Sequence, residues 1–478
     1  MSYLSPIYAI LTICIEVVGI LLAMRAILIA RTPQSALAWA GVLVFLPFIG
    51  IPLFLVFGES RFAGYTRAGK DGVKALDEAL HAIVRYLDGY RVLFTGDFAE
   101  PERMARNLTR LPATSNNDVR LLVDGHATFE AIFEAIDAAE ESIWIQFFII
   151  HDDLLGRTLA EKLLAAAGRG VKCRVLYDQV GSKTLPVSWP NRLRQAGMAV
   201  EAFVTNRQFG RRFQINFRNH RKLVIVDARV AFLGGLNVGD EYMGHSRRFG
   251  PWRDTHVRID GPAVAGFQLT FLEDWNYVTR EVPEYRLRPP SHTPRHSASV
   301  FPVATGPSES WSTCTAVYLS AIHCATERLW IASPYFVPSS PLFYAICHAA
   351  IRGVDVRIIL PKMADHLLPW LSSFTYYPKL REAGVKVWRY QPGFMHQKVL
   401  LADNDVTIVG SINLDYRSFM LNFELAAAIQ DINFASDVEA MFLADFDRSR
   451  PENLRAFDDG SLLFRLKCRA AALMSPEQ

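Results

Sequence analysis

The stretch "HRKLVIVDARVAFLGGLN" at residues 220–237 has a close counterpart in "HQKVLLADNDVTIVGSIN" at residues 396–413. Each begins with a histidine and a lysine one residue apart, followed by apolar residues, an aspartate and a glycine-containing turn that ends in asparagine. The apolar runs predict buried strands. Alternate residues of a strand share a face, so the histidine and lysine of each stretch point the same way. The chain therefore presents one unusual polar pair twice.

The sequence around these two stretches is also repeated. Three further blocks match in the same order, offset by 182 to 187 residues. Each copy alternates short β-branched runs with helical stretches, which predicts an α/β fold of two tandem repeats, each a mixed β-sheet flanked by helices. The matched blocks are "ESIWIQFFII" (141–150) with "ERLWIASPYF" (327–336), "AAAGRGVKCRVLYD" (165–178) with "CHAAIRGVDVRIILP" (347–361), and "RLRQAG" (192–197) with "KLREAG" (379–384).

The remaining segments have different compositions. A helix with an apolar face is predicted where Val73, Leu76, Leu80, Ile83 and Leu87 recur at helical spacing, and we expect it to pack on its own protein. A proline- and arginine-rich stretch separates the repeats. We expect a transmembrane hairpin over 1–60, the amphipathic helix and a connector over 61–116, the first repeat over 117–280, a linker over 281–299 and the second repeat over 300–478.

Two long apolar segments open the chain, at residues 7–30 and 36–58. Each exceeds the roughly 20 residues that span a bilayer core, so they predict a helical hairpin in the membrane. No basic region precedes the first segment, which argues against a cleaved signal peptide. Pro47 and Pro52 leave open a second segment that is kinked or re-entrant. Basic residues Arg61, Arg67 and Lys70 follow it, which predicts a cytoplasmic location for the rest of the chain.

The overall composition excludes several classes of protein. With 478 residues, a net charge of +3 and half of its residues apolar, the chain is neither disordered nor strongly basic. Nucleic-acid binders of this size are usually far more basic, so no nucleic-acid partner is expected. The six cysteines are scattered without a CxxC pair. They indicate buried thiols in a reducing compartment rather than disulfides or a zinc site.

The duplicated motif has the groups needed to hold a phosphate. If the repeats meet, two lysine charges, two asparagine amides and glycine-lined backbone would form an anion site. Two histidines suit phosphoryl transfer without a metal, because one imidazole can attack phosphorus while the other moves protons. The candidate residues are His220, Lys222, Asp227, Gly235 and Asn237 in the first copy, and His396, Lys398, Asp403, Ser411 and Asn413 in the second.

A nucleophilic histidine must be neutral and held in one tautomer, which calls for a nearby carboxylate. Asp254 in "WRDTHV" and Glu424 in "NFELAA" are the candidates. Asp227 and Asp403 either take part in the chemistry or only fix the ends of their strands, and the sequence leaves both roles open. A metal site is disfavoured because each histidine neighbours a lysine rather than a second ligand. No cofactor is expected.

The pattern HxKx4Dx6G[GS]xN in two copies resembles the phospholipase D superfamily, over residues 117–450. Within it, "PLFLVFGES", "GGLNVGDEYMG", "FLEDWNY" and "NLDYRSFMLNFELAAAI" look like the bacterial cardiolipin synthase family. The resemblance implies a phosphatidyltransferase of the bacterial inner membrane that joins two phosphatidylglycerol molecules and releases glycerol, with neither nucleotide nor metal. It also implies a phosphohistidine, which we expect on His220, with His396 as acid and base. His151 departs from the family pattern, and we expect "HDD" (151–153) to cap a helix.

Other functions are compatible with parts of the same sequence. A hydrolase of the same chemistry would use water as acceptor, and another transferase could use phosphatidylethanolamine. Arg417 and Ser418 could orient an acceptor or merely begin a helix. A nuclease is disfavoured by the charge and the apolar segments. A scaffold without activity would be expected to lack one of the four histidines and lysines, and none is missing. The sequence does not indicate an oligomeric state.

Overall fold

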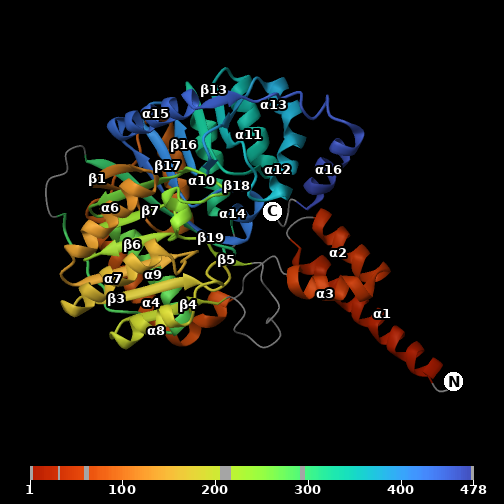
Figure 1. The fold of residues 1–478 in the computed structure, drawn as a ribbon, viewed down its shortest axis with the longest axis horizontal. Helices are drawn as coiled ribbons and strands as arrows, with labels where there is room; N and C mark the ends of the chain where they lie inside the picture. Colours follow the sequence, from red (N-terminus) through yellow and green to blue (C-terminus); the bar gives the residue numbers. More distant parts are fainter. Residues whose placement is uncertain are drawn as a thin grey trace.

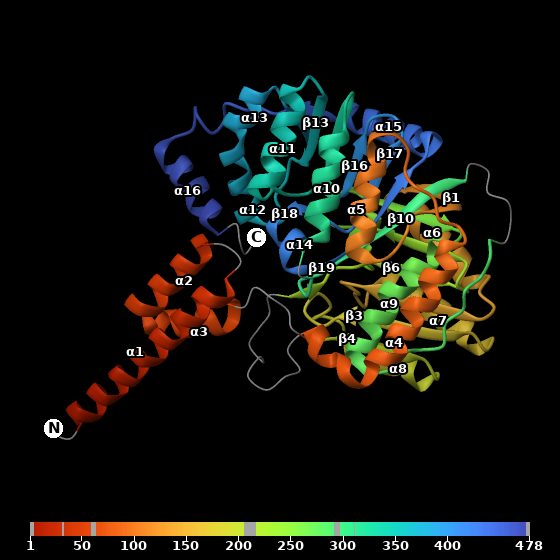
Figure 2. The ribbon, with the colours of Figure 1, turned by 180° about the vertical axis from the view of Figure 1, so that it is seen from behind.

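The computed structural model describes residues 4–30, 33–58, 64–204, 217–290, 297–309 and 311–474. Two α/β units lie side by side in the body, and a group of N-terminal helices projects away from it (Figure 1). The same arrangement, seen from behind, shows the C-terminal helix on the side of the body from which these helices project (Figure 2).

The first repeat is a mixed sheet covered by helices. Its strands lie in the order β9-β7-β6-β2-β3-β4, with β2, β3 and β4 parallel and the others antiparallel. The strands are β2 (Ser142–Phe147), β3 (Lys172–Asp178), β4 (Ala199–Phe203), β6 (Leu223–Val226), β7 (Val230–Gly234) and β9 (Thr255–Asp260). The helices are α6 (Asp124–Asp137), α7 (Leu154–Gly168), α8 (Ser188–Gln195) and α9 (Val264–Thr279).

The second repeat has the same order, β19-β17-β16-β11-β13-β14, again with its β11, β13 and β14 parallel. This agreement confirms the duplicated α/β fold. Its strands are β11 (Arg328–Ala332), β13 (Asp355–Pro361), β14 (Lys386–Tyr390), β16 (Val399–Ala402), β17 (Val406–Gly410) and β19 (Asn422–Gln430). Its helices include α10 (Thr313–Cys324), α11 (Ser340–Ile351), α12 (Leu367–Ser373), α13 (Tyr377–Ala383), α14 (Tyr416–Met420), α15 (Ile432–Asp447) and α16 (Leu462–Leu473).

The two sheets are joined into one. Strand β1 (Thr114–Val123) pairs with β9 of the first repeat and with β10 (Ala298–Thr305), and β10 pairs with β19 of the second repeat. Strands β9 and β19 follow the motif strands of their own repeats, so this junction brings the two motifs to the middle of a continuous sheet. Apolar side chains from both repeats form one of the buried clusters there. A continuous sheet fixes how the repeats sit relative to one another.

The connector before the repeats packs on both of them. Helix α4 (Gly64–Asp88) lies against α9, with Ala79, Ile83 and Leu87 buried and Leu76 and Leu80 packed beside them. The amphipathic helix therefore packs on its own protein, as expected, although the side chain of Val73 lies outside the described residues. Helix α5 (Ala99–Thr109) packs against α10 of the second repeat. None of the six cysteines, which all lie in the described ranges, forms a disulfide.

The N-terminal segments differ from a simple hairpin. Helix α1 (Leu4–Ile29) contains a stretch, Tyr8–Ile29, that is long and apolar enough to cross a membrane. The second segment is broken into α2 (Pro33–Phe45) and α3 (Pro47–Phe57), each too short to span alone. The break falls at Leu46, whose backbone leaves the helical region because a proline follows it. The second apolar segment is thus kinked, which is one of the alternatives that Pro47 and Pro52 left open.

Helix α3 turns back against α2. A Cβ on Gly50 would lie 2.7 Å from the backbone oxygen of Val42. In a straight helix these two residues would lie much farther apart, so the chain reverses direction between them. Several residues on which the sequence argument relied lie outside the described residues. They are Arg61, the side chains of Arg67 and Lys70, and residues 291–296 of the linker.

Candidate active site

The first histidine of the duplicated motif is bound by a carboxylate of the other repeat. His220 Nδ1 lies 3.0 Å from both carboxylate oxygens of Glu424. Glu424 is fully buried and also accepts hydrogen bonds from Ser411 Oγ, at 2.5 Å, and Asn422 Nδ2, at 3.2 Å. The ring of Phe148 packs edge-on to His220, with 4.9 Å between ring centroids. The imidazole is thereby held in one position.

The second histidine has the mirrored arrangement. His396 Nδ1 lies 3.0 Å from Oδ2 of Asp254, a residue of the first repeat. Asp254 is fully buried, and its Oδ1 accepts a hydrogen bond from the backbone N–H of Thr255 at 2.8 Å. Trp252 packs against His396 with 5.2 Å between ring centroids. The two carboxylates predicted from the sequence are therefore both present, each serving the histidine of the opposite repeat.

Each carboxylate reaches the histidine of the other repeat because two short pairs of strands form between the repeats. Strand β5 (Arg218–Asn219), which leads into His220, pairs with β19, and the His220 N–H donates to the oxygen of Phe423 at 2.9 Å. Strand β15 (Phe394–Met395), which leads into His396, pairs with β8 (Trp252–Arg253), and the His396 N–H donates to the oxygen of Arg253 at 2.8 Å. Each histidine thus enters the site beside the carboxylate-bearing strand of the other repeat.

These contacts decide which ring nitrogen is basic. A carboxylate only accepts hydrogen bonds, so Nδ1 of each histidine carries the hydrogen and Nε2 keeps its lone pair. Lys398 Nζ also lies 2.8 Å from Nδ1 of His396. A protonated Nδ1 has no lone pair for that ammonium, so we assign the hydrogen bond to Asp254. Both Nε2 atoms are then available as nucleophile or base.

The two lysines lie behind their histidines and are almost fully buried. Lys222 Nζ donates to the backbone oxygen of His220 at 2.7 Å, and Lys398 Nζ donates to the backbone oxygen of His396. Both ammonium groups interact with Glu424 and Asp254. Lys398 also acts on His220 in the other repeat. The two halves of the site therefore share one electrostatic environment.

Burial sets the protonation of the site. It lowers the pKa of His220 to about 4, with Lys222 adding to the shift and Glu424 opposing it. Burial and then Lys398 lower the pKa of His396 to about 4. Both rings are therefore neutral at pH 7. Burial also lowers the pKa of Lys222 to about 7 and that of Lys398 to about 8, against the attraction of Glu424 and Asp254.

The carboxylates stay ionised in the same environment. Burial alone would raise the pKa of Asp254, but Lys398 and His396 outweigh it and hold that pKa below its usual value. Burial is likewise outweighed at Glu424, where His220 and Lys222 hold the pKa low. Two neutral histidines with charged carboxylates behind them are the protonation states that nucleophilic catalysis requires.

The motif aspartates lie away from the histidines, at the other ends of β6 and β16. Asp227 accepts hydrogen bonds from the backbone N–H groups of Glu140, Glu141 and Ser142 at 2.8 to 2.9 Å. Asp403 binds the corresponding N–H groups ahead of β11 in the second repeat. Both have positive φ angles, at turns that end the motif strands. The structure thus gives them the strand-fixing role, and it does not bring them to the histidines.

The turns after the motif strands support the site. Gly235 lies against Asp254, so close that a Cβ there would be 2.0 Å from Oδ1. Ser411, at the matching position, donates to Glu424 instead. Asn237 is hydrogen-bonded to the N–H of Ile149 and the hydroxyl of Tyr242, whereas the side-chain oxygen of Asn413 is buried without a hydrogen-bond partner.

A second layer of polar residues was missed by the sequence argument. The middle residue of each motif is bound by an aspartate from a later helix: Arg221 by Asp274 at 2.8 Å, and Gln397 by Asp445 at 2.8 Å. Arg253 forms a buried two-point ion pair with the same Asp445. The sequence does contain a sign of these aspartates, because "FLEDW" at 271–275, which includes Asp274, matches "FLADF" at 442–446, which includes Asp445.

Two further candidates have structural roles. Asp153 caps α7 by accepting from the N–H of Gly156 at 3.1 Å, which confirms the expected helix cap. Ser418 lies at the start of α14, where its N–H donates to Asp415 at 2.7 Å. Among the residues that the structure describes, no group of three or more histidines, cysteines, aspartates or glutamates is arranged to hold a metal ion.

Known proteins share this architecture. A family model described as "Cardiolipin synthase, PLD-like domain" matches residues 132–258 and 318–446. Cardiolipin synthase A of Pseudomonas putida (strain GB-1) is 43% identical over the full length of both chains. The chain belongs to the cardiolipin synthase family. It is thus a phosphatidyltransferase of the phospholipase D superfamily, as the duplicated motif indicated. Cardiolipin synthase A of Pseudomonas fluorescens is 44% identical, again over both full lengths.

Two other comparisons concern the N-terminal segment and the fold of the body. Residues 9–59 match a model described as "Phospholipase_D-nuclease N-terminal". The crystal structure of phosphatidylserine synthase from Haemophilus influenzae superimposes with a TM-score of 0.62, covering 79% of this chain and all of that one. At 17% identity, that likeness concerns the fold alone.

Proposed function

We propose that this cardiolipin synthase family member transfers a phosphatidyl group from one phosphatidylglycerol to a hydroxyl of a second one, forming cardiolipin and free glycerol. The observation that carries the proposal is the pair of histidines, each neutral, oriented by a buried carboxylate and backed by a lysine. This arrangement provides one nucleophile and one proton carrier in a single site.

In the first half-reaction, Nε2 of His220 attacks phosphorus. The N–P bond forms as the bond from phosphorus to the glycerol oxygen breaks, and His396 gives its proton to that oxygen. The bound phosphate, as an anion, favours the protonated form of His396 against the burial that otherwise keeps it neutral. Glu424 stabilises the positive charge that develops on His220.

In the second half-reaction, a hydroxyl of the acceptor lipid loses its proton to His396 and attacks phosphorus. The O–P bond forms and the N–P bond breaks, which restores both histidines. Lys222, Lys398 and the amides of Asn237 and Asn413 hold the phosphate oxygens throughout. Asp227 and Asp403 contribute by fixing the ends of the motif strands, rather than by contact with the substrate.

The N-terminal helices would anchor this chemistry at a membrane. We propose a multi-pass anchor in which α1 spans the bilayer and the broken second segment returns to the same region, with the catalytic body in the cytoplasm. The basic residues that follow the second segment support that orientation.

The experiment that tests the proposal follows both products. Purified protein in detergent is incubated with phosphatidylglycerol that is labelled in its headgroup, and lipids and released glycerol are measured together. We expect cardiolipin and glycerol to form in step without an added cofactor. Phosphatidic acid with glycerol would instead mean that water is the acceptor and that the protein is a hydrolase.

Two substitutions test the histidines. His220→Ala and His396→Ala should each reduce turnover by about 10³-fold or more, because each removes the nucleophile or the proton carrier. Circular dichroism and membrane insertion should stay as in the wild type. A single variant with near-wild-type turnover would refute the two-histidine mechanism.

A further inference from the structure

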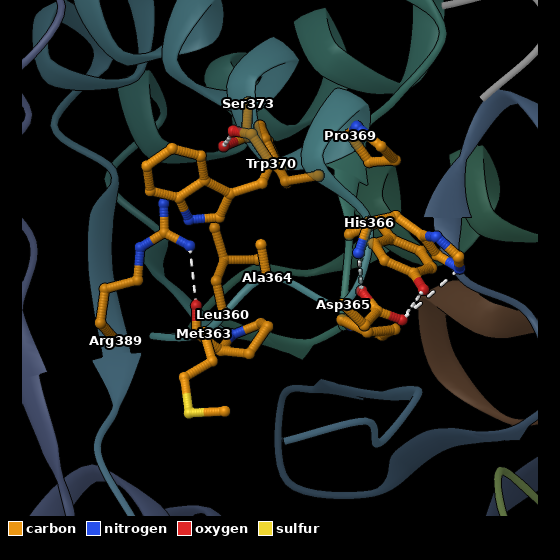
Figure 3. Close-up of a pocket in the computed structure, with 13 residues that line it drawn as sticks. Leu360, Met363, Ala364, Asp365, His366, Pro369, Trp370, Ser373 and Arg389 are labelled. Atoms are coloured by element: carbon orange, nitrogen blue, oxygen red, sulfur yellow. Dashed lines mark hydrogen bonds and ion pairs between the residues drawn. The ribbon is translucent and has the colours of Figure 1, made fainter. Parts of the chain in front are cut away.

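The second repeat contains a small pocket, drawn in Figure 3, whose lining includes a few polar side chains. Its wall includes Tyr335, Asp365, His366 and Trp370. The pocket has a volume of about 10 Å³, which is the room that one water molecule or one hydroxyl group needs. The Tyr335 hydroxyl donates to Asp365 Oδ2 at 2.5 Å, and the His366 N–H donates to Oδ1 at 2.7 Å. Each carboxylate oxygen keeps a lone pair for another donor.

Short strands tie this pocket to the motif. Strand β12 (Phe336–Val337) pairs in parallel with β18 (Leu414–Asp415), so Tyr335 lies next to Asn413 at the entry to the strand pair. Ser333 strengthens this link, since its hydroxyl accepts from the N–H of Leu414 at 2.9 Å. The carboxylate of Asp365 also acts on His396, where it opposes the burial that lowers the histidine pKa. The pocket therefore belongs to the surroundings of His396 and Asn413.

The first repeat lacks these groups. In the matched blocks, Ile149 stands where the second repeat has Tyr335. Ser182 stands as many residues after the end of β3 as Asp365 stands after the end of β13. The Ser182 hydroxyl donates to the backbone oxygen of Phe148 and accepts from the N–H of Ile150, so it is already satisfied by the backbone. A negative carboxylate repels a phosphate and attracts a hydroxyl hydrogen. The two halves of a nearly symmetric site thus differ in the chemistry that they favour.

From this asymmetry we propose that Asp365 and Tyr335 form the subsite for the alcohol headgroup of the acceptor lipid. They bind the hydroxyl adjacent to the one that attacks, so the preferred acceptor is a headgroup with two neighbouring hydroxyls, such as glycerol. The inference rests on the proposed function, in which His396 takes the proton of the attacking hydroxyl. The bonds that form and break are those of the second half-reaction and are unchanged by it.

The test is a competition between two soluble acceptors. Full-length protein in detergent micelles is given a phosphatidyl donor with glycerol and 1-propanol at equal concentration, and the ratio of the two phosphatidyl alcohols is measured. Asp365→Asn should lower the glycerol-to-propanol ratio about tenfold, because charged acceptors bind roughly twice as strongly as neutral ones. Tyr335→Phe should lower it in the same direction. Asp437→Asn, an exposed carboxylate on α15, is the matched control and should not change it.

The outcomes distinguish a loss of acceptor selectivity from a loss of the chemical step itself. Equal loss of both alcohol products would mean that Asp365 supports the fold or the chemistry, and would overturn the inference. An unchanged ratio, or a wild type without preference for glycerol, would overturn it as well. Because the ratio can be measured with any phosphatidyl donor that is cleaved, failure on phosphatidylglycerol alone would count only against the proposed function.

Discussion

Gly235→Ala is the smallest change that should disable one half of the site. The backbone of Gly235 has a φ angle that any residue can adopt, so the substitution tests space alone. The added Cβ would lie 2.0 Å from Oδ1 and 2.7 Å from Cγ of Asp254. Ordinary contact begins at 3.4 Å. The carboxylate, or the turn that carries residue 235, must move by roughly an ångström or more.

The size of the effect follows from the contacts of Asp254. It orients His396 through a single hydrogen bond of 3.0 Å, and a shift of about 1 Å in a catalytic group costs on the order of 10²-fold in rate. This equals about 2.7 kcal/mol of lost transition-state stabilisation. Because Asp254 is fully buried, its charge cannot be solvated after the move, and the free energy of unfolding should fall by about 1–3 kcal/mol.

The assay is a double-mutant cycle on kcat. Gly235→Ala and Asp254→Asn are measured singly and together, with thermal unfolding recorded for each. If the alanine acts through the carboxylate, the double variant should be no slower than the slower single variant. Full activity of Gly235→Ala, or losses that multiply in the double variant, would refute the reasoning.

Three other expectations concern residues of the two motifs. The pH profile of kcat/KM should fall below about pH 4, where His220 gains a proton and loses its nucleophilic lone pair, and above about pH 7, where Lys222 begins to lose its proton. Lys222→Arg should move the alkaline limb toward about pH 8, where Lys398 titrates, and an unmoved limb would contradict this. Asp227→Asn should lower the unfolding free energy by about 1.5–3 kcal/mol while kcat per folded molecule stays near wild type, and a selective loss of kcat would show a chemical role. Ser411→Ala removes a donor to the buried Glu424 and should slow turnover about tenfold while lowering the free energy of unfolding by about 1–3 kcal/mol; unaltered turnover would mean that Glu424 needs no such support.

Much of this site could be predicted from the chain alone. The spacing of His220 and Lys222 placed both on one face of a strand, and the repeat placed a second pair beside them. Asp254 and Glu424 could be named because neutral histidines need carboxylates. The sequence could not show that each carboxylate binds the histidine of the other repeat, because this depends on which short strands pair across the junction. The contact of Gly235 with Asp254 was hidden for the same reason.

Other features depend on packing that no local pattern records. The interruption at Leu46 follows from proline chemistry, but the way α3 folds back on α2 does not. Tyr335 and Asp365 lie 30 residues apart and meet only because their strands are neighbours in the sheet. The matching "FLED" and "FLAD" phrases were visible in the sequence, yet their partners Arg221 and Gln397 become meaningful only with the helices in place.

The exchange of carboxylates means that neither repeat contains a working half. A fragment ending before the linker would hold His220 without Glu424, and Asp254 without His396. If the chain were cut between the repeats, activity would return only when the two pieces found one another, so its rate of recovery would scale with the concentration of both. The linker therefore acts as a tether that makes the assembly of the two repeats intramolecular. The fraction of chains with a complete site then does not depend on the protein concentration.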